Sequence, residues 1–328
     1  MAMVKATLVE AINAALRQEM ERDKRVIVIG EDVGKDGGVF RVTDGLYARF
    51  GEERVIDTPL AESGIVGTAI GLAVSGLRPV AEVQFDGFVY PAFDQLISHA
   101  ARIRNRSRGR FHCPLVLRMP YGGGIKALEH HSEAMEALFV HLPGCKVVIP
   151  SNPYDAKGLM VSAIREEDPV LFLEPKKLYR AFKQEIPEEP YAVPLGEARL
   201  VREGTDVTVV SYGNMARVSN DAAELAQEQG ISAEVIDLRT VSPLDKKAVV
   251  DSVKKTGRAV IVHEAPRSCG VGAELAATIA RRAILSLKAP MERITGCDII
   301  TPYPRLEDYY LPNPKRVLNA IKKTMSDF

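Results

Sequence analysis

The chain has 328 residues, enough for about two domains, which excludes a small protein held together by disulfides. Its 43 Lys and Arg residues balance 43 Asp and Glu residues, and 46% of the chain is hydrophobic while 26% is charged. This composition is typical of a globular protein, so a disordered chain and one that binds polyanions through bulk positive charge are both disfavoured.

Cysteine spacing and hydropathy favour a cytoplasmic protein. Cys113, Cys145, Cys269 and Cys297 are scattered, and none have the close spacing of a zinc ribbon or a redox dithiol. Residues 1–22 lack an apolar signal core, and the longest uncharged stretch, residues 63–77, is shorter than the ~20 apolar residues of a membrane span. We therefore expect a cytoplasmic chain whose partners include neither nucleic acid nor membrane.

In the first half of the chain, short β-branched runs alternate with helical patterns. Strands are predicted over residues 25–29, 54–56, 79–83, 115–117, 146–149 and 170–173, and helices over residues 7–22, 63–75, 91–105 and 154–165. This alternation is typical of βαβ units, so we expect an α/β fold with a parallel sheet.

A proline-rich segment separates a second, smaller α/β series. Pro187, Pro190 and Pro194 lie among acidic residues, a composition that favours an extended connection. We therefore expect a first domain at residues 1–186, a linker at 187–200 and a second domain at 201–328. Strands are predicted there over residues 207–210, 235–238 and 259–263, and helices over 216–229, 246–255 and 273–287.

An acidic glycine turn follows the first of these strands. Glu31 and Asp32 lie between Gly30 and Gly34, at the carboxyl end of a strand, where parallel sheets form their ligand crevices. A solvated acidic loop is the commoner interpretation of such a turn, and the chain contains no phosphate-binding fingerprint.

Glu62 is the carboxyl group with the most informative surroundings. It follows Pro59 and begins an apolar helical pattern whose glycines Gly64, Gly67 and Gly71 allow close backbone packing. A poorly solvated carboxyl there would favour its neutral form and could share a proton with a ligand nitrogen. The alternative is a carboxylate that only complements the helix N-terminus, and the residues alone do not separate the two.

Aromatic residues and a histidine pair follow later strands. Phe85, Phe88 and Tyr90 could stack on a planar ring or simply pack in the core. A flexible run of glycines, residues 122–124, leads to His130 and His131, which point in different directions and so disfavour a zinc site. One of these histidines as an acid, a base or an anion stabiliser fits better, unless both are plain surface residues.

Together these segments carry a resemblance that extends over essentially the whole chain. The blocks at residues 30–34, 57–64, 85–95, 131–132, 146–158 and 234–240 occur in the order seen in one family. The chain resembles the β subunit of the thiamine-diphosphate-dependent decarboxylating component of 2-oxo acid dehydrogenase complexes. The resemblance implies a pyrimidine-binding-type domain followed by a transketolase C-terminal-like domain.

The resemblance also assigns roles to four residues of this sequence. Glu62 matches the glutamate that hydrogen-bonds a ring nitrogen of the cofactor's aminopyrimidine, and Phe88 matches the aromatic residue that stacks on that ring. His131 matches the histidine implicated in passing the acyl group to the lipoyl arm. Glu31 matches an acid of a proton path between paired sites and is expected near the cofactor.

Metals and partners are implied in the same way. The family binds a structural K⁺ ion partly through backbone carbonyls near Ala163, Glu166 and Asp168, although Glu166 stands where aspartate is frequent. The chain has no Gly-Asp-Gly segment to hold Mg²⁺ and a diphosphate. An α subunit is therefore expected to supply that clamp in a two-α, two-β heterotetramer, and the C-terminal domain is expected to bind the lipoyl transacylase component.

The expected activity is oxidative decarboxylation of a 2-oxo acid with reductive acylation of a lipoyl group. The blocks at residues 174–180, 263–266 and 301–304 favour a branched-chain 2-oxo acid dehydrogenase. The alternatives are the β subunit of a pyruvate or acetoin dehydrogenase, and a non-catalytic docking subunit of the same complex.

Overall fold

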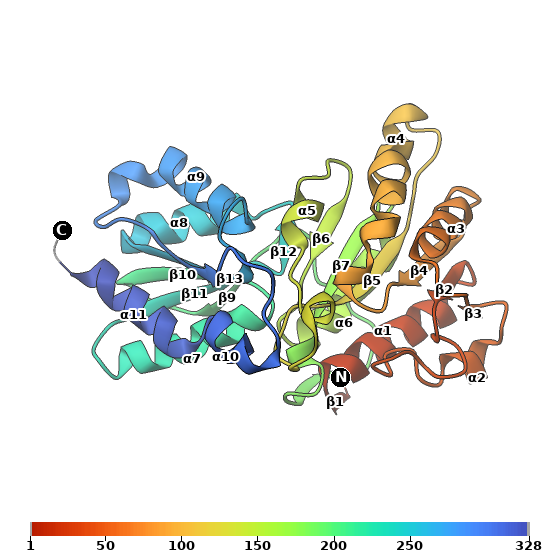
Figure 1. Cartoon of the computed structure of the whole chain (residues 1–328), viewed down its shortest axis with the longest axis horizontal. Coiled ribbons are helices and arrows are strands. Elements are labelled where there is room, and N and C mark those ends of the chain that lie inside the picture. The colour runs from red at the N-terminus through yellow and green to blue at the C-terminus, as the bar shows by residue number, and fades with distance from the viewer. Residues whose placement is uncertain (1, 327–328) are drawn as a thin grey trace.

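Two mostly parallel sheets organise the chain, one in each half (Figure 1). The computed structural model describes residues 2–326. Met1, Asp327 and Phe328, and with them the outer limits of the two expected domains, lie outside the described residues. In the described part of the chain, no helix has both the length and the apolar character needed to cross a bilayer.

The first sheet has seven strands in the order β12-β6-β7-β5-β4-β2-β3. Its strands are β2 (Val26–Gly30), β3 (Val55–Asp57), β4 (Arg78–Glu82), β5 (Val116–Tyr121), β6 (Lys146–Val148), β7 (Val170–Pro175) and β12 (Thr240–Ser242). The six strands from the first half run parallel, which confirms the expected parallel sheet. The antiparallel edge strand β12 comes from the second half and was not predicted.

Helices cover both faces of this sheet. Alternate residues of each strand point to opposite sides, and both sets are apolar here, so both faces must be buried. Val28 joins a core formed with α1 (Leu8–Arg22) and α6 (Pro153–Arg165), whereas its neighbour Ile29 joins a core formed with α3 (Glu62–Val74). Thr7 begins α1 through a reciprocal capping box with Glu10. Shorter elements of this half are β1 (Met3–Ala6), β8 (Gln184–Pro187), α2 (Leu46–Phe50), α4 (Ile103–Arg106) and α5 (Glu136–Val140).

The helix predicted over residues 91–105 is wrong as a single α-helix. The segment runs from a 3₁₀ turn (Tyr90–Ala92) through a π-helical turn (Gln95–His99) and a second 3₁₀ turn (Ala100–Arg102) into α4. The division falls at His99, whose φ of −123° and ψ of −72° leave the helical region. Hydrophobic periodicity predicts the helical path here, but it does not predict the change in hydrogen-bonding pattern.

The second sheet has five strands in the order β14-β13-β10-β11-β9. They are β9 (Arg199–Arg202), β10 (Val207–Ser211), β11 (Ala233–Asp237), β13 (Ala259–Pro266) and β14 (Glu292–Gly296), with only β9 antiparallel. Helices α7 (Asn214–Gln227), α8 (Lys246–Thr256), α9 (Val271–Ala283), α10 (Glu307–Tyr310) and α11 (Pro314–Met325) accompany it. This smaller α/β unit was expected, but α11 and β14 were not.

The segment between β8 and β9 follows the surface of α6. The buried Lys157 Nζ donates to the carbonyls of Pro187 and Glu188 at 2.7 and 2.8 Å, and Ser162 Oγ donates to Val193 O at 2.6 Å. The chain is therefore extended here but fastened to the first half. The domain boundaries expected at residues 186 and 200 stay a prediction. Strand β12 lies beyond them in the sequence but joins the sheet of the first half.

Candidate functional site

The four residues expected at the cofactor follow four neighbouring parallel strands. Glu31 comes directly after β2, Glu62 opens α3 after β3, Phe88 follows β4, and His131 follows β5. Since the carboxyl ends of parallel strands meet at one edge of a sheet, the fold brings these side chains to the same edge.

Glu31 and Glu62 are electrostatic neighbours at this edge. Burial raises the pKa of Glu31, and the negative charges of Asp32 and Glu62 raise it further. The Asp57 carboxylate joins the two loops, because it accepts the Gly34 amide at 2.6 Å. A Cβ at Gly34 would lie 2.6 Å from Asp57 Oδ2, so this contact requires glycine.

The glycine-spaced helix α3 departs from expectation. Ser63 Oγ donates to Pro91 O at 2.6 Å and so fixes the start of α3 against the aromatic loop. A Cβ added at Gly71, however, would meet no atom within 4 Å. The close packing expected there is therefore not made within this chain at Gly71, and Glu62 is half-buried.

His131 lies among the aromatic side chains. Its ring centroid is 5.1 Å from that of Phe88 and 4.5 Å from that of Phe85, both edge-to-face. Phe85 is buried and behaves as a core residue, whereas Phe88 and His131 are half-buried at the surface of the cluster. Among the described residues, His131 Nδ1 is buried without a hydrogen-bond partner. The site therefore offers an aromatic wall and a polar atom free to bind a further group.

Sequence reasoning missed a buried ion cluster beneath this edge. Arg118 on β5 donates through Nε and Nη2 to the Glu174 carboxylate at 2.7 Å for both contacts, and through Nη1 to Glu82. Tyr179 also donates to Glu174, at 2.6 Å. Each of three apolar strand runs contains a charged residue. Buried charges need partners of opposite charge, so this pattern could have predicted that the three side chains pair with one another.

A second missed pair is Asp86 and Lys176. Both are buried, and Lys176 Nζ lies 5.4 Å from the centroid of the Phe85 ring. Burial raises the pKa of Asp86 and lowers the pKa of Lys176, while the attraction between the two opposes both shifts. Two ionisable groups thus lie directly behind the aromatic wall.

The glycine run expected to be flexible is instead anchored by the second half of the chain. Gly123 N donates to Glu264 Oε2 at 3.1 Å, and Lys126 N donates to Glu307 Oε2 at 2.7 Å. Gly124 N also donates to Glu307. The loop that leads to His131 is therefore fixed by two buried carboxylates across the boundary between the halves.

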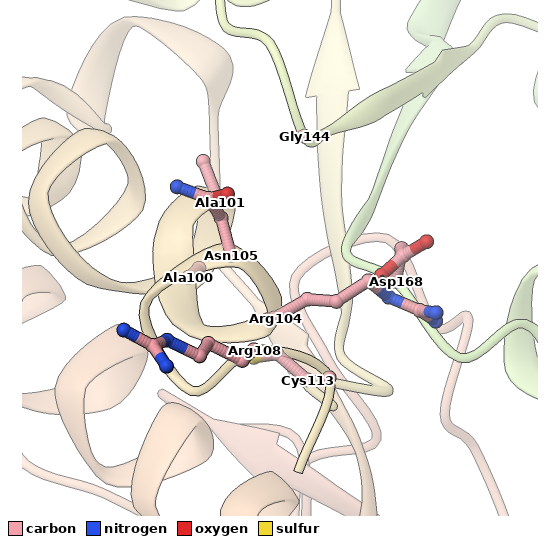
Figure 2. A pocket seen from close by; sticks show the side chains of 9 residues that line it. Ala100, Ala101, Arg104, Asn105, Arg108, Cys113, Gly144 and Asp168 are labelled. Atoms are coloured by element: carbon pink, nitrogen blue, oxygen red, sulfur yellow. Dashed lines mark hydrogen bonds and ion pairs between the residues drawn. The ribbon is translucent and has the colours of Figure 1, made fainter. Parts of the chain in front are cut away.

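The residues expected at a K⁺ ion lie elsewhere. Ala163, Glu166 and Asp168 lie at the C-terminal end of α6 and just before β7, at the amino edge of the sheet. A hollow of about 470 Å³ adjoins Asp168 there and is lined in part by Arg104, Arg108 and Cys113 (Figure 2). Residues 2–326 contain no group of three or more His, Cys, Asp or Glu side chains arranged to hold a metal ion.

Comparison with known proteins defines the class first. Residues 4–181 match the family model described as the transketolase pyrimidine binding domain, and residues 196–317 match the transketolase C-terminal domain. A solved structure titled "Split gene transketolase, inactive beta4 tetramer" superposes with a TM-score of 0.81 over 98% of this chain and 99% of that chain. At 22% identity this likeness shows the fold alone. The chain is therefore a two-domain protein of the transketolase class.

Sequence relatives narrow the class to one family. The chain is 55% identical to the pyruvate dehydrogenase E1 component subunit beta of Acholeplasma laidlawii over 317 residues, which cover 97% of each protein. It is 52% identical to the subunit of the same name from Bacillus subtilis over 323 residues, 98% of this chain and 99% of that relative. The chain belongs to the β-subunit family of the thiamine-diphosphate-dependent 2-oxo acid dehydrogenase E1 components. The expected family is thus confirmed.

Proposed function

We propose that the chain is the β subunit of a pyruvate dehydrogenase and that it acts only together with an α subunit. The observation that supports this proposal is that Glu62, Phe88 and His131 follow strands that end at the same edge of the sheet, with Phe88 and His131 in ring contact, in a chain that has no Gly-Asp-Gly segment. The chain therefore has residues suited to the ring end of thiamine diphosphate and lacks a clamp for its diphosphate end.

The residues at the site fit the ring end of this cofactor. A planar, nitrogen-bearing ring and its substrate would bind an aromatic face at Phe88, a carboxyl at Glu62 and the His131 Nδ1 atom, which has no partner among residues 2–326. When bound, thiamine diphosphate supplies a nucleophilic carbon and an electron sink for the loss of CO₂.

Four side chains then have distinct tasks. Glu62 holds or shares a proton at a ring nitrogen, and Phe88 orients the ring by stacking. His131 donates a hydrogen bond or a proton at the reacting carbonyl as the acyl group leaves for the lipoyl arm. Glu31, whose pKa is raised by burial and by the charges of Asp32 and Glu62, is the acid through which a proton path leaves this site.

Pyruvate is the substrate that the comparisons favour. Several relatives that are 51–55% identical over nearly the whole chain are named pyruvate dehydrogenase subunits, which supports the alternative rather than the branched-chain enzyme expected first. The experiment is turnover of the assembled α/β enzyme on pyruvate and on 3-methyl-2-oxobutanoate. We expect the higher kcat/KM for pyruvate, and the opposite ranking would restore the branched-chain assignment.

The partner proposal follows from the missing clamp. An α subunit would hold Mg²⁺ and the diphosphate, so that each site lies between two chains of an α₂β₂ enzyme. The exposed face of α3 around Gly64 and Gly71 has the open backbone that a second chain could pack against. We also propose that the C-terminal domain binds the lipoyl transacylase and that the enzyme is cytoplasmic.

A Glu62→Gln variant tests the catalytic role against the docking-subunit alternative. We expect decarboxylation by the assembled enzyme to fall by about 10²–10⁴-fold, the usual contribution of a positioned proton-transfer group. Glu52→Gln, which changes an exposed acid before β3, is the matched control and should retain activity. Unchanged turnover in Glu62→Gln would favour a docking role, and full turnover by this chain alone would refute the shared site.

A further inference from the structure

The backbone between α6 and β7 presents several oxygen atoms that attract positive charge. Residues 163–168 present the last carbonyls of α6, which carry partial negative charge because no amide of the helix follows them. The carboxylates of Glu166, Glu167 and Asp168 add to that charge. A cluster of carbonyls with nearby carboxylates is the kind of site that holds K⁺ in proteins, as the family resemblance implies.

In this chain an arginine already lies against those carbonyls. Arg78 Nη1 donates to Ile164 O and to Glu166 O, both at 3.0 Å, and Arg78 Nη2 donates to the Glu167 carboxylate. The side chain is only 11% exposed, so the guanidinium is held within the protein. Arg78 is the first residue of β4, and its amide bonds to Arg25 O at 2.8 Å, which fixes the base of the side chain in the sheet.

The remaining expected ligands also have partners. Lys146 Nζ lies 2.8 Å from Glu166 Oε2, and Arg104 Nε lies 2.6 Å from Asp168 Oδ1 (Figure 2). Ala163 O accepts the Glu166 amide at 3.3 Å. Three cationic side chains from three separate segments thus neutralise residues 163–168, and the residues present do not fit a K⁺ ion.

We infer that the Arg78 guanidinium takes the place of the structural potassium ion, so that this chain folds and works without bound K⁺. A guanidinium brings the same single positive charge, and its planar set of donors can bond two carbonyls and a carboxylate together. A K⁺ ion at the same carbonyls would share them with the guanidinium, and two charges that share ligands in this way lie on the order of 4 Å apart. At an effective dielectric constant of about 20, that repulsion weakens binding by about a thousandfold.

The test is thermal unfolding of the full chain in KCl, NaCl and choline chloride at equal ionic strength. We expect the wild-type melting temperatures in the three salts to agree within about 1 °C. In Arg78→Ala the carbonyls lose their cation, so the melting temperature should fall in choline chloride. Addition of KCl should then raise the melting temperature again, saturably, by about 2–4 °C. A shift of this size is usual for a modest stabilisation of a domain of more than about 150 residues.

Arg104→Ala is the matched control. It removes a cation from the same segment, at Asp168, but leaves Arg78 on the carbonyls of Ile164 and Glu166, so it should show no preference for K⁺. A wild-type chain that K⁺ stabilises saturably and selectively would overturn the inference, even if Arg78→Ala proves too unstable to purify. An Arg78→Ala chain that melts identically in all three salts would also overturn it. Because the readout is unfolding, neither outcome depends on the proposed reaction.

Discussion

At the scale of single residues, His263 is an ionisable group buried without a partner. In the described part of the chain, neither ring nitrogen has a partner in hydrogen-bond geometry, and the ring stacks on Tyr212 at 6.2 Å between centroids. A Cβ at Gly272 would lie 2.7 Å from His263 Nε2, so there is little room for water. Burial lowers the pKa of His263 to about 4, the backbone of Ala265 partly opposes this, and the charge of Arg293 adds to it.

This shift predicts a loss of stability on acidification. Between pH 6.5 and about 4 the unfolded chain binds a proton at His263 that the folded chain does not, so the free energy of unfolding falls as the pH falls. From pH 7 to pH 5 the contribution is about 2 kcal/mol. Since buried carboxyls with raised pKa values, such as Glu136 and Glu264, act in the opposite direction, the measurement is a difference between variants.

Urea unfolding at both pH values makes the comparison. We expect His263→Asn to lose about 2 kcal/mol less than the wild type between pH 7 and pH 5. His99→Asn, at an exposed histidine, should behave like the wild type. Equal losses in His263→Asn and the wild type would mean that His263 binds its proton at the same pH in the folded and unfolded chain, and so that burial does not lower its pKa.

At the scale of elements, the connection between the halves is held by α6. Lys157 is 1% exposed and donates three hydrogen bonds to the carbonyls of Pro187, Glu188 and Glu189. Val193 N adds a bond to Gly158 O at 3.0 Å. Without the ammonium group, these carbonyls would be left without their donor, at a cost of about 1–3 kcal/mol for each one that stays buried.

Local proteolysis reports this anchoring. We expect Lys157→Met to increase the rate of cleavage after Glu188 by a glutamate-specific protease about tenfold or more, because the segment opens at lower free energy. Lys183→Met is the control, since its ammonium group is mostly exposed and lies 3.8 Å from Glu10. A cleavage rate in Lys157→Met equal to that of the control would show that the prolines alone keep the segment in place.

The central elements were predictable because their signals are local. The strands β2 to β7 are short apolar runs, and Thr7 and Glu10 form a capping-box pattern that marks the start of α1 in the sequence. The edge strand β12 was not predictable, because Thr240 pairs with Val148, far away in the chain. Short edge strands obtain their conformation from the neighbour, so propensity carries little information about them.

The candidate site likewise has some features that the sequence predicts and others that it does not. The sequence motif around Glu62 and the order of blocks up to His131 were sufficient to recognise the family and to propose its site residues. The pairing of Arg118 with Glu174 joins residues 56 positions apart, and only the parallel register of β5 and β7 brings them together. Such partners require the fold before they can be assigned.

At the scale of the whole molecule, the two halves share one polar boundary. β12 extends the first sheet, and Tyr212 OH donates to the buried Glu136 carboxylate at 2.7 Å from the other half. Asp155 on α6 accepts Arg239 at 3.0 Å. The second half therefore does more than attach to the first, since Glu264 and Glu307 also fix the loop that leads to His131.

This arrangement predicts that a residue of the second half controls one part of the proposed reaction. Glu307 is 2% exposed and accepts the amides of Gly124 and Lys126 with separate oxygens. In Glu307→Gln the amide NH₂ group would face one of these N–H donors, so one bond becomes repulsive and the loop loosens. Glu62 is the first residue of α3, outside this loop, and should keep its position.

The two proposed half-reactions can be measured separately in the assembled enzyme. We expect transfer to the lipoyl group in Glu307→Gln to fall about tenfold through the misplacement of His131, while decarboxylation measured with an artificial electron acceptor stays within about twofold. Asp308→Asn is the matched control, because its side chain is 72% exposed and pairs with the exposed Lys126 ammonium at 3.0 Å. Equal losses in both assays would mean that Glu307 is needed for the folding of the whole site and not for lipoyl transfer alone. No loss in either assay would show that the Glu264 contact alone is sufficient to position the loop.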